Sequence, residues 1–319
     1  MSSPNTSTPL SFASDYKSFQ HPSEVNIGSD KHHLHEVFNS NNLSSLPDEV
    51  LLFLHSSIAH ISEPNQGRFI SAVKEVQSLL NKLSESNKVK VFSDIAKLLD
   101  RKRPLTNSLS EKEVDKFRLV FVLLLFEQAV LEPISVDLYS QLCHSLTKRF
   151  EGFHHNLIDH CQHHFEKFFI KDTSISDEVQ NELICHKKSN LITSIDKVSV
   201  ETKLKARVLG NFRFVAALIL HTILPSGVAS VITKQLVTNY QKPMAIEGLI
   251  TLWTKILESA GINDYIELVV AKIIIEFSTD LSIPKCDRDL CSEWVKMYHE
   301  NQLKQALLRI SPKRIPKRP

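Results

Sequence analysis

The stretch SEKEVDKFRLVFVLLLFEQAVLEPISVDLYSQLCHSL, residues 110–146, decides the fold class. Ser110 followed by Glu113 is a capping box, in which two side chains satisfy the first free backbone N–H groups of a helix. The apolar run that follows predicts a long helix through Leu131. Pro133 ends it, because proline removes a backbone donor and clashes with the preceding turn. A second helix follows at once, so the stretch predicts two helices joined by a short turn.

The sequence on both sides of this stretch also has apolar residues three or four positions apart, which is typical of helices with one buried face. One predicted helix face N-terminal to it is made of Phe69, Val73, Val76, Leu80 and Leu83. Ser84 is predicted to cap the next helix, whose apolar face is Val89, Phe92, Ile95 and Leu99. Further helices are predicted at about 135–149, 153–170, 177–188, 200–222, 264–279 and 287–309, with others starting near Pro47, Pro225 and Pro243.

Sequential helices with short turns form either a closed bundle or a stack of antiparallel pairs. Pair lengths near 40 residues fit a HEAT-type α-solenoid of about five pairs, so we expect an all-α protein, although periodicity alone fits both arrangements. The helix YIELVVAKIIIEF is apolar nearly all round, which suits an inner position. We expect the helical domain at 47–310, a variable insertion at 170–199, a disordered Ser/Asn-rich segment at 1–46 and a basic disordered tail at 311–319.

Composition excludes several classes of protein. Only 7 of 319 residues are glycine, and no glycine-rich phosphate-binding loop can be written. The net charge is +2, and four basic residues in the last nine account for it. The five cysteines are an odd number behind an N-terminus without an apolar leader, which favours reduced thiols and an intracellular, cytoplasmic protein. No stretch predicts a membrane span.

The histidines and cysteines are the residues that could indicate a metal site or a catalytic centre. The histidines that crowd one predicted helix are His154, His155, His160, His163 and His164. His160 and His164 share a face, as zinc ligands on a helix can, but no further ligands complete a set at standard spacing. We therefore predict polar-face histidines and no metal. Cys143 and Cys161 lie on amphipathic helices where cysteine packs as a small hydrophobe, so we predict no catalytic residue and no cofactor.

Three basic tracts are candidates for weak, salt-sensitive contacts with phosphate backbones. Ordinary exposure of charged side chains to water explains each tract equally well. The tracts are Arg101, Lys102 and Arg103; Lys203, Lys205 and Arg207; and Lys313, Arg314, Lys317 and Arg318.

Three segments in order resemble the middle domain of eukaryotic translation initiation factor 4 gamma. They are LLLFEQAVLEPISVDLYSQLCHSL (123–146), HHNLIDHCQHHFEK (154–167) and KARVLGNFRFVAALILHTIL (205–224). SLLNKLS and IEGLITLWTKIL extend the resemblance to about residues 67–280. The residues that match the family's motifs are Phe126, Glu127, Glu132, Pro133, Tyr139, Cys143, Cys161, Phe165, Leu209, Gly210, Asn211 and Phe214. Gly210 in a helix is expected to allow a close helix crossing, and Asn211 to satisfy backbone groups there.

The resemblance implies a crescent of five HEAT-like pairs that acts as a translation initiation scaffold. It implies binding and stimulation of a DEAD-box RNA helicase, contact with mRNA and other initiation factors, and no catalysis. The turn Leu80, Asn81, Lys82 and Leu83 matches the family's helicase-binding turn, although plain core packing explains its leucines equally well.

Departures from the family pattern leave an alternative open. Lys88 or Val89 stands where the family has a phenylalanine, and Ala216 and Ala217 replace its Gly-Glu. No motif for the cap-binding subunit follows Tyr16, so that partner is not expected through this chain. The alternative is a paralogous mRNA adaptor with the same domain: a poly(A)-binding-protein-interacting, histone-mRNA, nonsense-decay or deadenylation scaffold.

Overall fold

The computed structural model describes residues 48–59, 61–100, 109–169, 194–260 and 269–310. In these ranges the chain forms eleven α-helices and no β-strand, which confirms the all-α class. The predictions for 1–46, Arg101–Arg103, the helix at 177–188 and the tail lie outside the described residues. Helix α2 (Asp48–Ile58) belongs to a unit that ends at Ala59, and all other helices belong to the unit His60–Pro319. The boundaries of the predicted domains stay a prediction.

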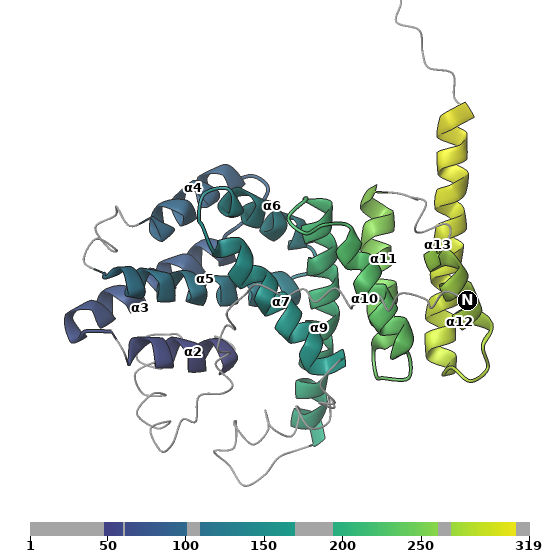
Figure 1. The fold of residues 1–319 in the computed structure, drawn as a ribbon, viewed down its shortest axis with the longest axis horizontal. Helices are drawn as coiled ribbons and strands as arrows, with labels where there is room; N and C mark the ends of the chain where they lie inside the picture. The colour runs from purple at the N-terminus through teal and green to yellow at the C-terminus, as the bar shows by residue number, and fades with distance from the viewer. Residues whose placement is uncertain (1–47, 60, 101–108, 170–193, 261–268, 311–319) are drawn as a thin grey trace, which may run out of the picture. The chain divides into compact units, whose positions relative to one another are not determined.

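The described helices of the unit His60–Pro319 form five pairs (Figure 1). Consecutive helices pack against each other in each pair. The pairs are α3 (Glu63–Asn81) with α4 (Lys88–Leu99), α5 (Glu111–Leu131) with α6 (Val136–Thr147), α7 (Phe153–Phe169) with α9 (Ser194–Leu220), α10 (Gly227–Thr238) with α11 (Ala245–Ala260), and α12 (Ala271–Thr279) with α13 (Lys285–Ile310).

Neighbouring pairs stack in chain order. Helix α3 packs on α5 and α4 on α6, and α5 packs on both α7 and α9. Helix α9 then packs on α11, and α11 on α13. Each pair thereby buries its apolar faces on the next pair, which is the packing of a HEAT-like solenoid.

Helix α5 forms the centre of the core and has the bounds that the sequence predicts. The Ser110 N–H donates to Glu113 Oε2 at 2.7 Å, and the Glu113 N–H donates to Ser110 Oγ at 3.4 Å, so the predicted capping box is present. The helix ends at Leu131, two residues before Pro133. Its phenylalanines are completely buried, including Phe117 and Phe121.

Two expectations about individual helices are wrong. Helix α4 begins at Lys88 with Asn87 as its N-cap, not directly after Ser84. Its buried face is therefore Val91, Ile95, Ala96, Leu98 and Leu99, and Val89 is 79% exposed. Helix α12 belongs to the last pair of the stack, so it is buried on one side only: Ile274 is 0% exposed and Ile275 is 40% exposed. Among the described residues, no helix is long and apolar enough to cross a membrane.

Candidate partner-binding site

The turn between α3 and α4 presents the residues that the sequence singles out for partner binding. Asn81 and Lys82 are exposed and Leu83 is half-buried, whereas Leu80 is only 1% exposed. Leu80 therefore fixes the end of α3 in the core. Of the four residues Leu80 to Leu83, the last three present surface that a partner can touch.

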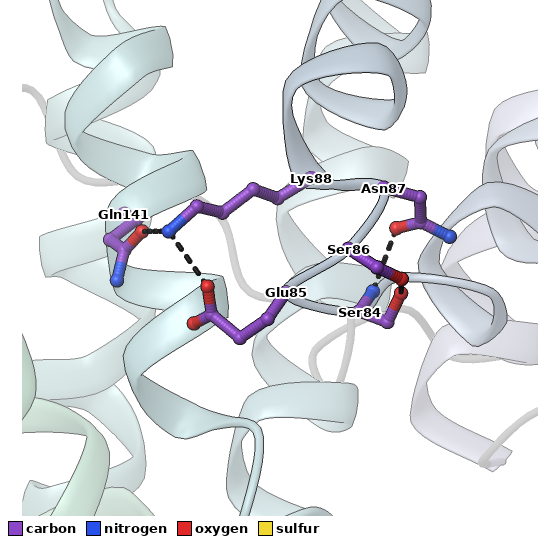
Figure 2. A network of polar contacts seen from close by, with 6 residues as sticks. All are labelled: Ser84, Glu85, Ser86, Asn87, Lys88 and Gln141. Atoms are coloured by element: carbon purple, nitrogen blue, oxygen red, sulfur yellow. Dashed lines mark hydrogen bonds and ion pairs between the residues drawn. The ribbon is translucent and has the colours of Figure 1, made fainter.

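The side chain of Asn87 holds this turn in one conformation (Figure 2). Its Nδ2 donates to the Lys82 carbonyl oxygen at 2.7 Å, at the end of α3. Its Oδ1 accepts from the Ser84 N–H at 2.9 Å. The Ser84 hydroxyl pairs with the Ser86 hydroxyl at 3.0 Å and does not cap α4. Asparagine is as good an N-cap residue as serine, so the composition of this turn could have indicated Asn87.

Lys88 ties the same turn to the second helix pair. In Figure 2 its side chain extends from the first residue of α4 toward α6, and its Nζ donates to Gln141 Oε1 at 3.0 Å. The same Nζ lies 2.8 Å from Glu85 Oε2. The turn is thus held by bonds within its own pair and by one bond to the second pair, so it loses little conformational entropy when a partner binds.

The outward face of α4 continues from this turn and was missed by the sequence reasoning. An open groove of about 480 Å³ runs along it. Its lining residues are Ser86, Asn87, Val89, Lys90, Ser93, Asp94 and Lys97. The signal that could have found it is the spacing of these residues, which repeats every three or four positions as an exposed stripe does.

Helix α9 crosses α5 at Gly210, where the two backbones meet. A Cβ at Gly210 would overlap the carbonyl group of Val130. On the neighbouring helix α7, the Cys161 carbonyl oxygen accepts from Asn211 Nδ2 at 3.2 Å. The glycine thus allows the close approach and the asparagine satisfies a backbone group, as the sequence predicts. Both residues build the scaffold and are buried.

A buried ion pair also joins α5 to α9. Arg207 Nη2 lies 3.0 Å from Glu127 Oε2, and the two side chains are 17% and 5% exposed. We therefore assign Arg207 to the scaffold and not to an RNA contact. Lys203 and Lys205 of the same tract are exposed, and Lys205 Nζ lies 2.9 Å from Glu201.

Other motif residues pack inside the stack. Phe126, Tyr139, Cys143 and Phe214 are at most 1% exposed. The Tyr139 hydroxyl donates to Glu132 Oε2 at 2.9 Å across the α5–α6 turn. The motif accordingly specifies packing and turn geometry, and a partner cannot reach these four side chains.

The predicted polar face is wrong for two of the α7 histidines, whereas His154, His155 and His163 are half-buried. His160 and His164 are buried against the ring of Phe126, with centroids 4.4 Å and 5.4 Å away. Within the described ranges, no three His, Cys, Asp or Glu side chains are grouped as metal ligands would be. Burial raises the pKa of the Cys143 and Cys161 thiols, so neither is a ready nucleophile at neutral pH.

Comparison with known proteins places the chain in a family. The family model for the MIF4G domain matches residues 73–261, more than half of the chain. The chain belongs to the MIF4G domain family. MIF4G domains are scaffolds of translation initiation and mRNA adaptor proteins that interact with protein and RNA, and the family is not catalytic.

One solved structure of this family is a remote match. The MIF4G domain of Trypanosoma cruzi translation initiation factor EIF4G5 aligns at 15% identity and a TM-score of 0.40. The alignment covers 74% of this chain and 98% of that chain. The family assignment rests on the match to the family model alone.

Proposed function

We propose that this MIF4G chain is a translation initiation scaffold that binds and stimulates a DEAD-box RNA helicase, contacts mRNA and performs no chemistry itself. One observation carries the proposal: the turn that resembles the family's helicase-binding turn is exposed at Asn81 and Lys82 and is held rigid by Asn87. A preorganised turn loses little conformational freedom when a partner binds, so more of its contact energy contributes to affinity.

The proposed scaffold contributes geometry and leaves the ATP chemistry to its partner. A stack of packed helices changes shape little, so it can hold two lobes of a bound helicase at a fixed separation. Fixing that separation lowers the entropic cost of closing the partner's active site in every cycle. We place this activity in the cytoplasm, together with other initiation factors. Lys203 and Lys205 are the described candidates for an RNA backbone contact.

A binding titration tests the proposal. The purified chain is titrated with the initiation-factor DEAD-box helicase, and the helicase ATPase rate is measured in parallel. We expect binding, a faster ATPase, and a loss of at least tenfold in affinity for Lys82→Glu with Leu83→Asp, because the exposed turn would then carry the wrong charge and polarity. Leu80 is left unchanged, since an aspartate at a 1% exposed position would disrupt the core.

A matched control makes the same chemical changes elsewhere. Lys112→Glu with Val198→Asp alters one exposed lysine and one 62% exposed valine outside the turn. Circular dichroism confirms that both double variants stay helical. If the unmodified chain leaves the initiation helicase unbound and captures poly(A)-binding protein or a decay factor, the paralogous adaptor replaces this proposal.

A further inference from the structure

The groove on α4 begins next to the proposed helicase-binding turn. It is lined by lysines and one exposed valine. We infer that the partner-binding surface continues from the α3–α4 turn onto the outward face of α4, where the groove takes an acidic segment of the helicase that carries one aliphatic side chain. This inference rests on the proposed function and adds to it the chemistry of the contact.

Val89 is the first observation. It is 79% exposed, while the other aliphatic residues of α4 lie in the core, with Val91 at 5% and Ile95 at 0%. A β-branched residue lowers helix propensity slightly, and an exposed one gains no packing in return. Val89 lines the groove, so an aliphatic side chain of the partner would cover it there.

Continuity with the turn is the second observation. Ser86 and Asn87 line the groove and also belong to the polar network that fixes the turn (Figure 2). A partner that contacts Asn81 and Lys82 therefore reaches the groove without crossing another helix. The groove of about 480 Å³ is of the size that accepts a few side chains.

Charge is the third observation. Lys90 and Lys97 both line the groove, and Asp94 is its only acidic lining residue. Asp94 Oδ1 lies 3.0 Å from Lys97 Nζ and is neutralised by it. Lys90 is exposed and has no ion-pair partner within the described part of the chain. The groove therefore has an excess positive charge beside one aliphatic side chain, Val89, which favours an acidic segment over a basic one.

RNA is the rival occupant and fits the groove less well. A phosphate backbone would use Lys90, but it would gain nothing from Val89, because it carries no aliphatic side chain. An acidic peptide segment with an aliphatic side chain uses the lysine and the valine together.

Two single variants test the inference, Val89→Asp and Lys90→Glu. Both side chains are exposed, so the fold is expected to survive, and circular dichroism checks this. Titrated with the initiation-factor helicase, each variant is expected to bind about tenfold more weakly than the unmodified chain. Lys90→Glu should also reduce the dependence of affinity on salt, whereas Lys90→Arg should bind like the unmodified chain. Val198→Asp and Lys112→Glu are the matched single controls and should change nothing.

The outcomes separate this inference from the proposed function. If Lys82→Glu with Leu83→Asp loses helicase binding but Val89→Asp and Lys90→Glu do not, the groove is not part of the interface and the inference is wrong while the function stands. If the unmodified chain binds no helicase, both fail. If Lys90→Glu weakens binding to oligo(U) RNA and leaves helicase binding unchanged, the groove is an RNA contact and the inference is overturned.

Discussion

Gly210 and Asn211 fix the position of α9 by opposite means. Gly210 contributes the absence of a side chain, so that the backbone of α5 can lie against it. Asn211 contributes a donor that reaches the carbonyl oxygen of Cys161 on α7. Adjacent residues of one helix thus set its distance to two different neighbours, so we expect an ordinary apolar replacement of either one to destabilise the protein.

Replacing Gly210 by alanine should destabilise the protein in spite of alanine's better helix propensity. The new methyl group would overlap the Val130 carbonyl group, and overpacking of this kind costs about 1–3 kcal/mol. Urea unfolding followed by circular dichroism measures the effect. Gly67→Ala is the control, because a Cβ there meets nothing within 4 Å, and it should stabilise α3 by about 0.5–1 kcal/mol. Equal effects in the two variants would contradict the close crossing.

The sequence could predict the role of some single residues but not the exposure of others. Gly210 could be assigned because a glycine inside a helix has few explanations other than close packing. Leu80 and His160 could not be placed with the same certainty, because their exposure depends on the rotation of the helix. Leu80 is in the core, and His160 lies against Phe126 and not in water.

At the scale of elements, α4 and the turn before it decide how the candidate site faces a partner. The sequence places the start of α4 after Ser84 and Val89 on its core face, whereas the helix starts at Lys88 and Val89 is 79% exposed. Successive helical residues are separated by about 100°, so Val89 lies about 160° round the helix from the buried Val91, and the apolar spacing alone did not separate the two faces. The long helix α5 carried no such error, since its capping box fixes its start and Pro133 its end.

Asn87→Ala should loosen the α3–α4 turn without unfolding the helices. The variant loses the hydrogen bonds to the Lys82 carbonyl oxygen and from the Ser84 N–H, and each such bond contributes about 0.5–1.5 kcal/mol. Hydrogen exchange read by mass spectrometry should show faster exchange at residues 82–88.

Asn81→Ala is the control for that experiment, because Asn81 is exposed and lies outside the hydrogen bonds of the turn. It should leave exchange unchanged. Equal exchange in Asn87→Ala and the unmodified chain would mean that the turn is held by other contacts.

In the whole unit His60–Pro319, α9 connects its own helix pair to the pairs on both sides. It packs on α5, α6, α7, α10 and α11. The order of pairs could be predicted because short connections leave consecutive helices no other neighbours. The exposure of α12 could not be predicted, since an apolar helix looks the same whether or not a further pair follows it.

Stability of this unit should fall as the pH is lowered from 7 to about 5.5. Burial lowers the pKa of His221 below its ordinary value of 6.5, Asp137 opposes this, and His144 and Lys255 reinforce it. The unfolded chain then binds more protons than the folded one below about pH 6.5, so acid favours unfolding. In urea unfolding across this range, His221→Gln should lose less stability than the unmodified chain. His299→Gln, at an exposed position, is the control, and an equal loss in both variants would contradict the role of His221.

The contact between α5 and α9 has a consequence in time during synthesis on the ribosome. Eighty residues separate Val130 from Gly210, and at roughly 5–20 residues per second they take about 4–16 s to translate. Throughout that interval α5 has been made while α9, which packs on it, has not, so the nascent chain exposes apolar side chains of α5 that the folded protein buries. We therefore expect the emerging chain to bind chaperones that shield apolar segments, until α9 leaves the ribosome and closes the core.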